Sequence, residues 1–257
     1  TILLGGILLV ICAIAALLLI FSHQLAPHIP FRYEQALVNK FSELTSDNNS
    51  TEQTMIDAEL ALQELGQQLA ENSALAPDIE LHFHLLDEPG VPNACATLGG
   101  HIFVTTGLLR EVPSENALAM VLAHEIAHIK FRHPAQSISG GLLVQLFLSI
   151  VTGQNAVALQ GTVQQAGIMT VLGFSRKMES AADRAALDTL VQHYGHLADA
   201  EVFFEKILAK HQQASWQVIF ASHPDMQQRI EQIKNRTQKS KTAATKALDP
   251  RLSYENL

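Results

Sequence analysis

Residues 121–134 read VLAHEIAHIKFRHP and carry three histidines and one glutamate in an otherwise apolar, helix-forming run. Burying such polar side chains is costly unless they have partners. Pro113 and Ser114 are typical of a helix start, and His133-Pro134 is typical of a helix end. We therefore predict one apolar helix and ask what its polar side chains hold.

The spacing of these polar residues predicts a metal site. His124 and His128 stand four residues apart, so their imidazole rings project from one helix face about one turn apart and can bind one ion. Glu125 can then reach a water on the metal without ligating it. This is the H-E-x-x-H pattern. The alternative is two core histidines satisfied by backbone or water, but chance produces only about 0.03 such matches in a shuffled chain of this composition.

A catalytic zinc site needs three protein ligands and an open position. In residues 174–187, FSRKMESAADRAAL, Glu179 and Asp183 are again four apart on a predicted helix. We predict Glu179 as the third ligand, because the small residues around it let its helix pack close to the H-E-x-x-H helix. Asp183 then accepts the spare N–H of His124 or His128. A Glu/Asp pair in the polar linker upstream has the same spacing, but a linker is a poor place for a rigid ligand.

The remaining segments predict an α+β domain. Apolar residues recur at helical spacing over 54–70, whereas 78–86, DIELHFHLL, alternates with period two and predicts a strand with one buried face. His82 and His84 fall on the other face of this strand, where we expect them to be exposed rather than bound to a metal. Residues 87–109 predict a turn, a short strand, a glycine reversal and a second strand. We expect a mostly helical domain with a small antiparallel sheet.

The N-terminal run predicts a membrane anchor. Residues 2–21 carry no charged or strongly polar side chain, and at about 1.5 Å per residue they span roughly 30 Å, the thickness of the hydrocarbon layer. A buried core helix and a secretory signal are the alternatives that we rejected. The low positive charge of 22–40 favours the side away from the cytoplasm. The predicted division is anchor 1–21, juxtamembrane segment and linker 22–50, main domain 51–237 and polar tail 238–257.

Composition excludes some functions. The formal net charge of −8 and the pI of about 5.8 argue against a general nucleic-acid surface. Two cysteines cannot form a thiolate zinc site. The apolar region 142–172 is broken by polar residues into runs too short to span a bilayer. We expect it to pack over the site as core, with contact to the bilayer surface as the alternative.

Four motifs together carry a family resemblance. HEIAH at 124–128 and ESAAD at 179–183 resemble the gluzincin metallopeptidases, and more narrowly the family of HtpX, the Ste-type CAAX prenyl protease, the Oma-type and the BepA-like proteases. PNACATLGGHIFVTTGLL at 92–109 resembles the strand segment of that family, and SHPDMQQRI at 222–230 resembles its C-terminal motif. The resemblance covers roughly residues 52–235. Cys95 departs from it, because a larger apolar residue is common there.

The resemblance implies a zincin-like metallopeptidase domain with one Zn²⁺ per chain. His124, His128 and Glu179 match the zinc ligands of the family, and Glu125 matches its general base. In such enzymes the base takes a proton from the metal-bound water and passes it to the leaving amine.

The other two motifs imply further site residues. Asn93 and Ala94 match the edge segment that pairs with substrate backbone as an added strand, which selects extended polypeptide. His223 and Arg229 match the C-terminal motif. The histidine either stabilises the oxyanion or caps the zinc in a resting state. For Arg229, a structural salt bridge is the alternative to a role in the site.

These expectations lead to two functional hypotheses. The first is a membrane-anchored zinc endopeptidase that cleaves unfolded or misassembled envelope proteins, held by residues 2–21 in the bacterial inner membrane with its domain on the periplasmic side. The second is a zinc-stabilised chaperone-like or scaffold protein with a capped, silent site. The intact Glu125 favours the enzyme, because a structural site needs no general base. The sequence names neither a substrate nor an oligomeric state.

Overall fold

The computed structural model describes residues 13–14, 28, 30–36, 38, 52–137, 173–210, 212, 219, 223, 226–238, 243–253 and 255. The predicted linker, the apolar region 142–172 and the predicted anchor 2–21, apart from Ala13 and Ile14, lie outside these residues. Among the described helices, none is both long enough and apolar enough to cross a membrane.

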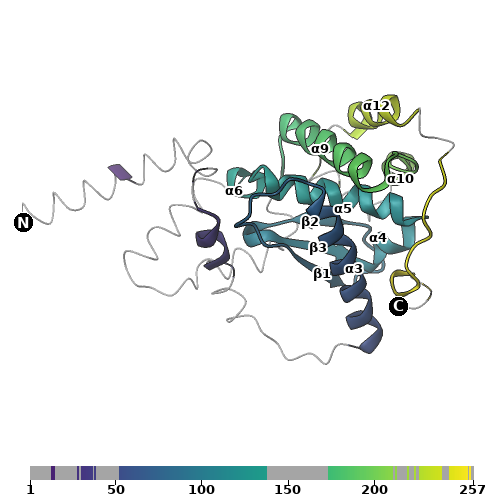
Figure 1. The fold of residues 1–257 in the computed structure, drawn as a ribbon, viewed down its shortest axis with the longest axis horizontal. Helices are drawn as coiled ribbons and strands as arrows, with labels where there is room; N and C mark the ends of the chain where they lie inside the picture. The colour runs from purple at the N-terminus through teal and green to yellow at the C-terminus, as the bar shows by residue number, and fades with distance from the viewer. Residues whose placement is uncertain are drawn as a thin grey trace, which may run out of the picture.

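A three-stranded sheet forms one layer of the domain (Figure 1). Its strands are β1 (His82–Leu86), β2 (Ala94–Ala96) and β3 (His101–Thr105), in the order β1-β3-β2. Strands β2 and β3 pair antiparallel through the predicted glycine reversal, but β1 and β3 pair in parallel. The prediction of an antiparallel sheet is therefore wrong for β1: the sheet is mixed.

The connection between β1 and β2 explains the parallel pairing. Residues 87–93 carry the chain past β3 to its far side, and the loop lies against the start of helix α4 (Thr106–Glu111). The Gly107 N–H donates to the carbonyl of Glu88, and a Cβ on Gly107 would lie 2.7 Å from the carbonyl oxygen of Val91. Only glycine allows this approach. Alternation along a strand reveals its buried face but not its partner or direction.

The outer edge of β1 is covered by helix α3 (Gln53–Glu71). The backbone N–H groups of Phe83 and Leu85 donate to the side chains of Gln63 and Glu59, at 2.9 and 2.8 Å. Because an open strand edge is a template for further strand pairing, these contacts close one side of the sheet. Strand β2 forms the other edge.

Helix α5 (Glu115–Lys130) runs between the sheet and helix α9 (Arg176–Tyr194) (Figure 1). Every residue of α5 from Glu115 to Ile129 is buried, so the helix is apolar on all sides except for Glu115 and Asn116 at its start and the site residues it carries. Two further helices, α10 (Val202–Lys210) and α12 (Met226–Thr237), pack beside α9 and α5.

The ends of α5 follow local rules. The Ser114 side chain accepts from the backbone N–H of Ala117 at 3.2 Å, as predicted for a helix start. The helix ends at Lys130, earlier than His133-Pro134, because Arg132 adopts a left-handed conformation with φ of 59°. A short helix α6 (His133–Ser137) then begins, with Pro134 in its first turn, where proline is tolerated.

Residues 243–253, which the sequence assigns to a polar tail, lie against the domain. The backbone N–H of Glu115 donates to the carbonyl of Lys246 at 3.0 Å, and the N–H of Lys246 donates to the Asn116 side chain at 2.7 Å. The helical turn η6 (Pro250–Leu252) packs on α3, with Leu252 buried. These contacts satisfy N–H and side-chain groups at the start of α5.

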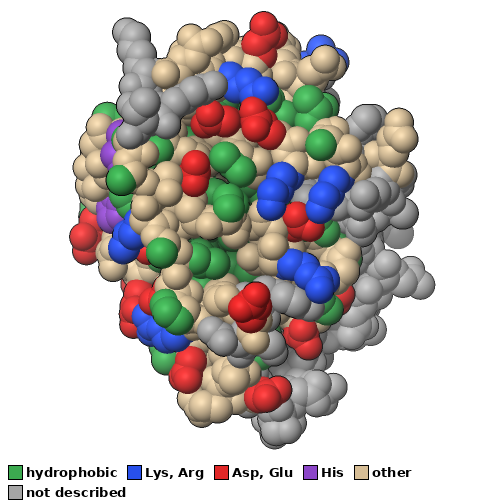
Figure 2. All heavy atoms as spheres, turned by 90° about the vertical axis from the view of Figure 1, so that its right-hand side faces the viewer, with side chains coloured by type: hydrophobic (Ala, Val, Ile, Leu, Met, Phe, Trp, Pro, Cys, Tyr) green, Lys and Arg blue, Asp and Glu red, His purple; other side chains and the backbone are tan. Residues whose placement is uncertain are grey.

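The face of the molecule that includes α10 and the C-terminal segment carries acidic and basic side chains side by side, with apolar side chains between them (Figure 2). Such a mixed surface differs from the basic stripe that tracks a phosphate backbone.

Candidate metal centre

Helices α5 and α9 bring the H-E-x-x-H and Glu-x-x-x-Asp motifs together. His124 and His128 project from α5, and Glu179 projects from the first turn of α9. The three side chains are 3%, 0% and 0% exposed. Small residues at the contact allow this approach, because Ala182 and Ala186 of α9 are fully buried.

Four side chains form one group of possible metal ligands, named here the buried cluster: His124, His128, Glu179 and His223. One ligand atom from each lies within 4.8 Å of all the others. The Nε2 atoms of His124 and His128 are 3.0 Å apart, and the two Glu179 oxygens lie 3.5 and 3.4 Å from them. Imidazole nitrogens and a carboxylate oxygen are the donors that zinc prefers, so the buried cluster is consistent with one zinc ion.

Asp183 and Arg229 support His124 from behind. The Nδ1 atom of His124 lies 3.0 Å from Asp183 Oδ1, so Asp183 stands where the spare ring N–H of a ligating histidine needs an acceptor. Arg229 donates to both Asp183 oxygens at 2.7 Å and also contacts Glu179. Arg229, 3% exposed, thus forms a buried salt bridge inside the site rather than on the surface.

His133 supports His128 in the same way, although sequence reasoning assigned it only to the helix end. Its Nδ1 atom lies 2.9 Å from His128 Nδ1, and its side chain is buried. When His128 presents Nε2 to the cluster, its Nδ1–H can donate to His133. The only signal in the sequence is a third histidine shortly after H-E-x-x-H. His133 reaches His128 because α5 ends at Lys130 and the chain then turns back into α6.

Glu125 lies beside the ligand atoms without joining them. It is 2% exposed, its Oε2 accepts from the backbone N–H of Ala96 in β2 at 2.7 Å, and its Oε1 lies 3.7 Å from His223 Nε2. Burial raises the pKa of Glu125, against the lowering effect of His223 and His124. A carboxylate with a raised pKa accepts a proton more readily than an exposed one.

Burial and nearby charges hold two of the ligands, Glu179 and His128, in the forms that bind a metal. Burial alone would raise the pKa of Glu179, but His223, His124 and Arg229 hold it far below the usual range. Burial lowers the pKa of His128 well below its ordinary value, so this ring is neutral. An ionised carboxylate and a neutral imidazole are the forms that bind a metal.

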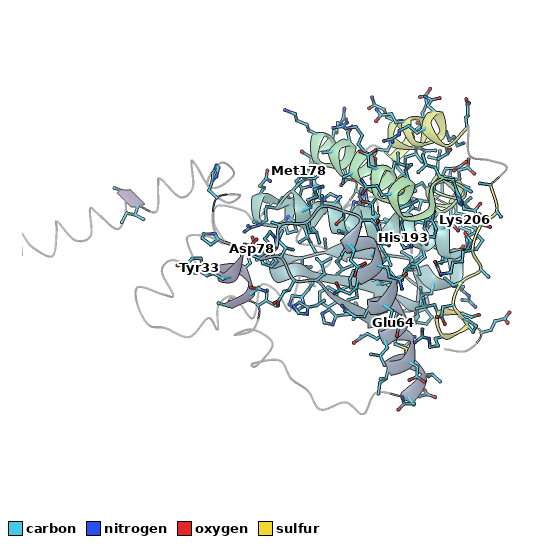
Figure 3. All side chains as sticks on the ribbon, viewed as in Figure 1. Tyr33, Glu64, Asp78, Met178, His193 and Lys206 are labelled. Carbon is cyan, nitrogen blue, oxygen red and sulfur yellow. The ribbon has the colours of Figure 1, made fainter. Side chains whose placement is uncertain are left out.

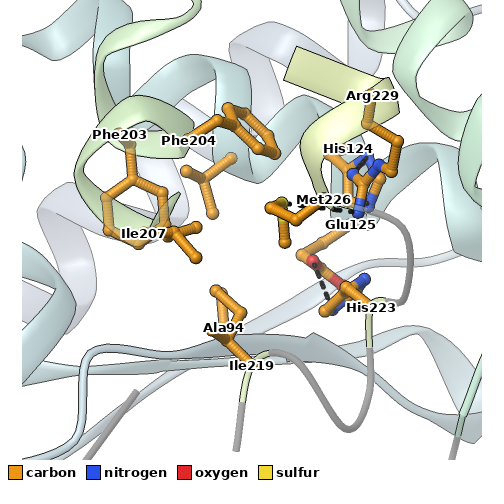
Figure 4. Close-up of a pocket in the computed structure, with 11 residues that line it drawn as sticks. Ala94, His124, Glu125, Phe203, Phe204, Ile207, Ile219, His223, Met226 and Arg229 are labelled. Atoms are coloured by element: carbon orange, nitrogen blue, oxygen red, sulfur yellow. Dashed lines mark hydrogen bonds and ion pairs between the residues drawn. The ribbon is translucent and has the colours of Figure 1, made fainter. Parts of the chain in front are cut away.

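A small apolar cavity of about 20 Å³ adjoins the buried cluster (Figure 4). It lies between α5, β2 and α10 and is lined by Ala94, Val121, His124, Glu125, Phe203, Phe204, Ile207, Ile219, His223, Met226 and Arg229. A volume of this size holds little more than one water molecule. The sequence alone did not reveal the apolar lining from α10. Phe203 and Phe204 look like ordinary core residues in the sequence, and only the position of α10 in the fold shows that they line the cavity.

The two residues predicted to bind substrate differ in position. Ala94 lines the cavity beside His124 and Glu125. Asn93 is fully buried, its backbone N–H donates to Thr105 Oγ1 at 3.0 Å, and within the described part of the chain its side-chain amide has no hydrogen-bond partner. Asn93, unlike Ala94, is not among the residues that line the cavity.

The fold and the buried cluster define a zinc metallopeptidase domain of the H-E-x-x-H class. The chain belongs to peptidase family M48, whose model matches residues 57–237. This membership confirms the resemblance that the four motifs indicated.

Two relatives illustrate the range of the family. The chain is 34% identical over 159 residues to the mitochondrial metalloendopeptidase OMA1 of Schizosaccharomyces pombe. The aligned region covers 61% of this chain and 46% of that protein. This chain is 29% identical over 178 residues to the beta-barrel assembly-enhancing protease of Escherichia coli. That aligned region covers 64% of this chain and 35% of the relative. The chain thus spans less than half the length of the relatives it matches.

Proposed function

We propose that this protein is a membrane-anchored zinc endopeptidase that hydrolyses peptide bonds in unfolded or misassembled envelope proteins. The observation that carries the proposal is the position of Glu125, which is buried beside the ligand atoms yet lies outside the ligand group. A purely structural zinc site has no use for such a carboxylate.

In the proposed reaction, His124, His128 and Glu179 would hold the zinc ion, which would supply Lewis-acid chemistry for the attacking water and the scissile carbonyl. Glu125 takes the proton of the water and passes it to the leaving amine. Asp183, itself held by Arg229, keeps the His124 ring oriented.

The substrate is proposed to bind as an extended strand along β2. Two features support this: β2 is an edge strand of the sheet, and it packs directly on α5 next to Glu125. Backbone pairing of this kind requires a chain without competing structure, hence unfolded polypeptide.

The cellular setting is proposed from two supports. Residues 2–21 are apolar enough to anchor the chain, and the names of the relatives place one in mitochondria and link another to β-barrel assembly. We propose a single-pass protein of the bacterial inner membrane with its peptidase domain, residues 51–237, on the periplasmic side.

The test compares wild type with Glu125→Gln on an unfolded protein substrate, with bound zinc measured in both. The variant is expected to keep zinc and to lose cleavage by about 10²- to 10⁴-fold, the usual contribution of a positioned base. Glu205→Gln is the matched control, because Glu205 is half-exposed and pairs with Lys234 on the surface. Equal cleavage by Glu125→Gln and wild type, or no cleavage by either with zinc bound, would refute the proposed endopeptidase activity.

A second candidate, a capped and silent site, draws on His223. Its Nδ1 atom lies 3.1 and 3.2 Å from the two Glu179 oxygens, which makes it a fourth possible zinc ligand, and the adjoining cavity is too small for an amino-acid side chain. If His223 caps the zinc, His223→Ala is expected to cleave faster than wild type. If His223 stabilises the oxyanion instead, the same variant cleaves more slowly at unchanged zinc content.

A further inference from the structure

A second group of histidines lies on the outward face of the sheet, and we name His82, His84 and His101 the sheet-face cluster. In the parallel register of β1 and β3, His82 is paired with His101, and His84 is paired with Phe103. The alternate residues Phe83 and Ile102 are buried in the core, so the three histidines share the opposite face. All three rings are partly exposed.

Two of these rings point nitrogens at each other. His84 Nε2 and His101 Nδ1 are 2.8 Å apart, while the ring centroids are 5.0 Å apart and the planes differ by 15°. The nitrogen–nitrogen distance accounts for most of the centroid separation, so the rings lie edge to edge rather than face to face. The His82 ring stacks beside His101 at 4.8 Å.

Contrary to the expectation from sequence for His82 and His84, we propose that the sheet-face cluster binds a divalent transition-metal ion, such as Zn²⁺ or Cu²⁺, through His84 Nε2 and His101 Nδ1, with His82 as an additional ligand. Such an ion would cross-link β1 to β3. Imidazole is a preferred ligand of these metals, and alternate positions on a strand keep two rings on one side.

Metal binding requires the His84 and His101 rings to separate and to turn towards a common ion. Two nitrogens about 2.0 Å from one tetrahedral ion stand roughly 3.3 Å apart, so the His84 and His101 nitrogens have to separate by about half an ångström. The corresponding nitrogens of the buried cluster are 3.0 Å apart. Within the described residues only the buried cluster brings three or more ligand atoms within 4.8 Å, so His82 has to rotate before it can contribute. We therefore expect the sheet-face site to be the weaker one.

The protonation of the cluster suits a metal. Burial, together with the neighbouring histidines, lowers the pKa of His101 to about 4, and burial also lowers the pKa of His84. Both rings are neutral at pH 7, so a metal does not have to displace a proton from an imidazolium ion.

Zinc binding to the full chain, kept in detergent because of its apolar N-terminal run, tests the proposal. The protein is first loaded with one equivalent of Zn²⁺, then dialysed against rising free Zn²⁺, and bound zinc is measured by mass spectrometry. Wild type is expected to take up a second equivalent, more weakly than the first. His84→Gln and His101→Gln should each keep the first equivalent and lose the second.

His193→Gln is the matched control, because His193 lies on α9 near its C-terminal end, outside both clusters (Figure 3). It should retain both equivalents. One equivalent throughout the titration of wild type, or a second equivalent that survives in both His84→Gln and His101→Gln, would overturn the proposal.

A spectroscopic measurement decides the case in which a variant fails to fold and loses both equivalents. Cu²⁺ is added to zinc-loaded wild type, and its electron paramagnetic resonance spectrum is expected to show coupling to at least two imidazole nitrogens. A spectrum without nitrogen coupling contradicts the sheet-face site, whatever the variants do.

Discussion

The buried cluster and the sheet-face cluster both place histidines on one face of a regular element, but the pKa values of His124 in the first and of His101 in the second shift in opposite directions. In the buried cluster, burial and Arg229 lower the pKa of His124, yet hydrogen bonds to Asp183 and Glu179 outweigh them and raise it to about 9. In the sheet-face cluster, burial and like neighbours leave His101 with a pKa of about 4. Carboxylates supplied by a second element, α9, make the difference.

The comparison shows why spacing alone does not define a metal site. On α5, a separation of four residues puts two rings together, whereas the His84 and His101 rings meet because β1 pairs with β3. Only the helix pair receives a carboxylate ligand, Glu179, and the acceptors Asp183 and His133 behind its rings. These partners fix the tautomer and the orientation of the His124 and His128 rings. Among the residues that the structure describes, the sheet-face rings have no such partners, and they have to rotate before they can bind a metal.

Removal of Glu179, the carboxylate ligand that distinguishes the buried cluster from the sheet-face cluster, is expected to have the largest effect. Glu179→Ala should lose zinc and all cleavage, because the buried cluster loses its only carboxylate ligand and the catalytic ligand set is left incomplete. Zinc content and cleavage of an unfolded protein measure this. Asp188→Ala is the control on the same helix, since the Asp188 side chain is 62% exposed and pairs with Arg236. Stoichiometric zinc in Glu179→Ala would show that the third ligand is assigned wrongly.

Removal of His133 tests the support behind the metal. His133→Ala is expected to weaken zinc binding by about 10- to 100-fold, the usual effect of losing the partner of a ligating histidine. Competition with a chelator of known affinity measures it. His193→Ala should leave zinc affinity unchanged, and an unchanged affinity in His133→Ala would mean that the 2.9 Å contact with His128 does not orient the ligand.

Acidification should lower the free energy of unfolding through the sheet-face cluster. This effect is the smallest of the three expected for the two clusters. The pKa of His101 is about 4 in the folded protein and 6.5 ordinarily, so between these values the unfolded chain binds more protons. The free energy of unfolding therefore falls as the pH drops from 6.5 towards 4. Because the rings are partly exposed, solvent screens the effect. Denaturant unfolding at pH 7 and pH 5 should show a smaller loss in His101→Gln than in wild type. An equal loss in both would refute this account.

Much of the fold could be predicted from local pattern. The helix over 54–70 corresponds to α3, and the period-two run at 78–86 contains β1 with Leu81, Phe83 and Leu85 buried as expected. The parallel pairing of β1 could not be predicted, because hydrogen-bond partners across a sheet depend on where a seven-residue loop carries the chain. Pro89, Gly90 and Pro92 mark that loop as a turn without indicating its route.

The candidate site divides in the same way. The sequence by itself determined the H-E-x-x-H pair on one helix face and the matching Glu179 and Asp183, since residues four apart on a helix share a face. Only the tertiary structure decided that Asp183 meets His124 rather than His128, that His133 turns back onto His128, and that Arg229 is buried in the site. These contacts join residues from different elements, and their formation depends on how the helices pack rather than on any spacing along the chain.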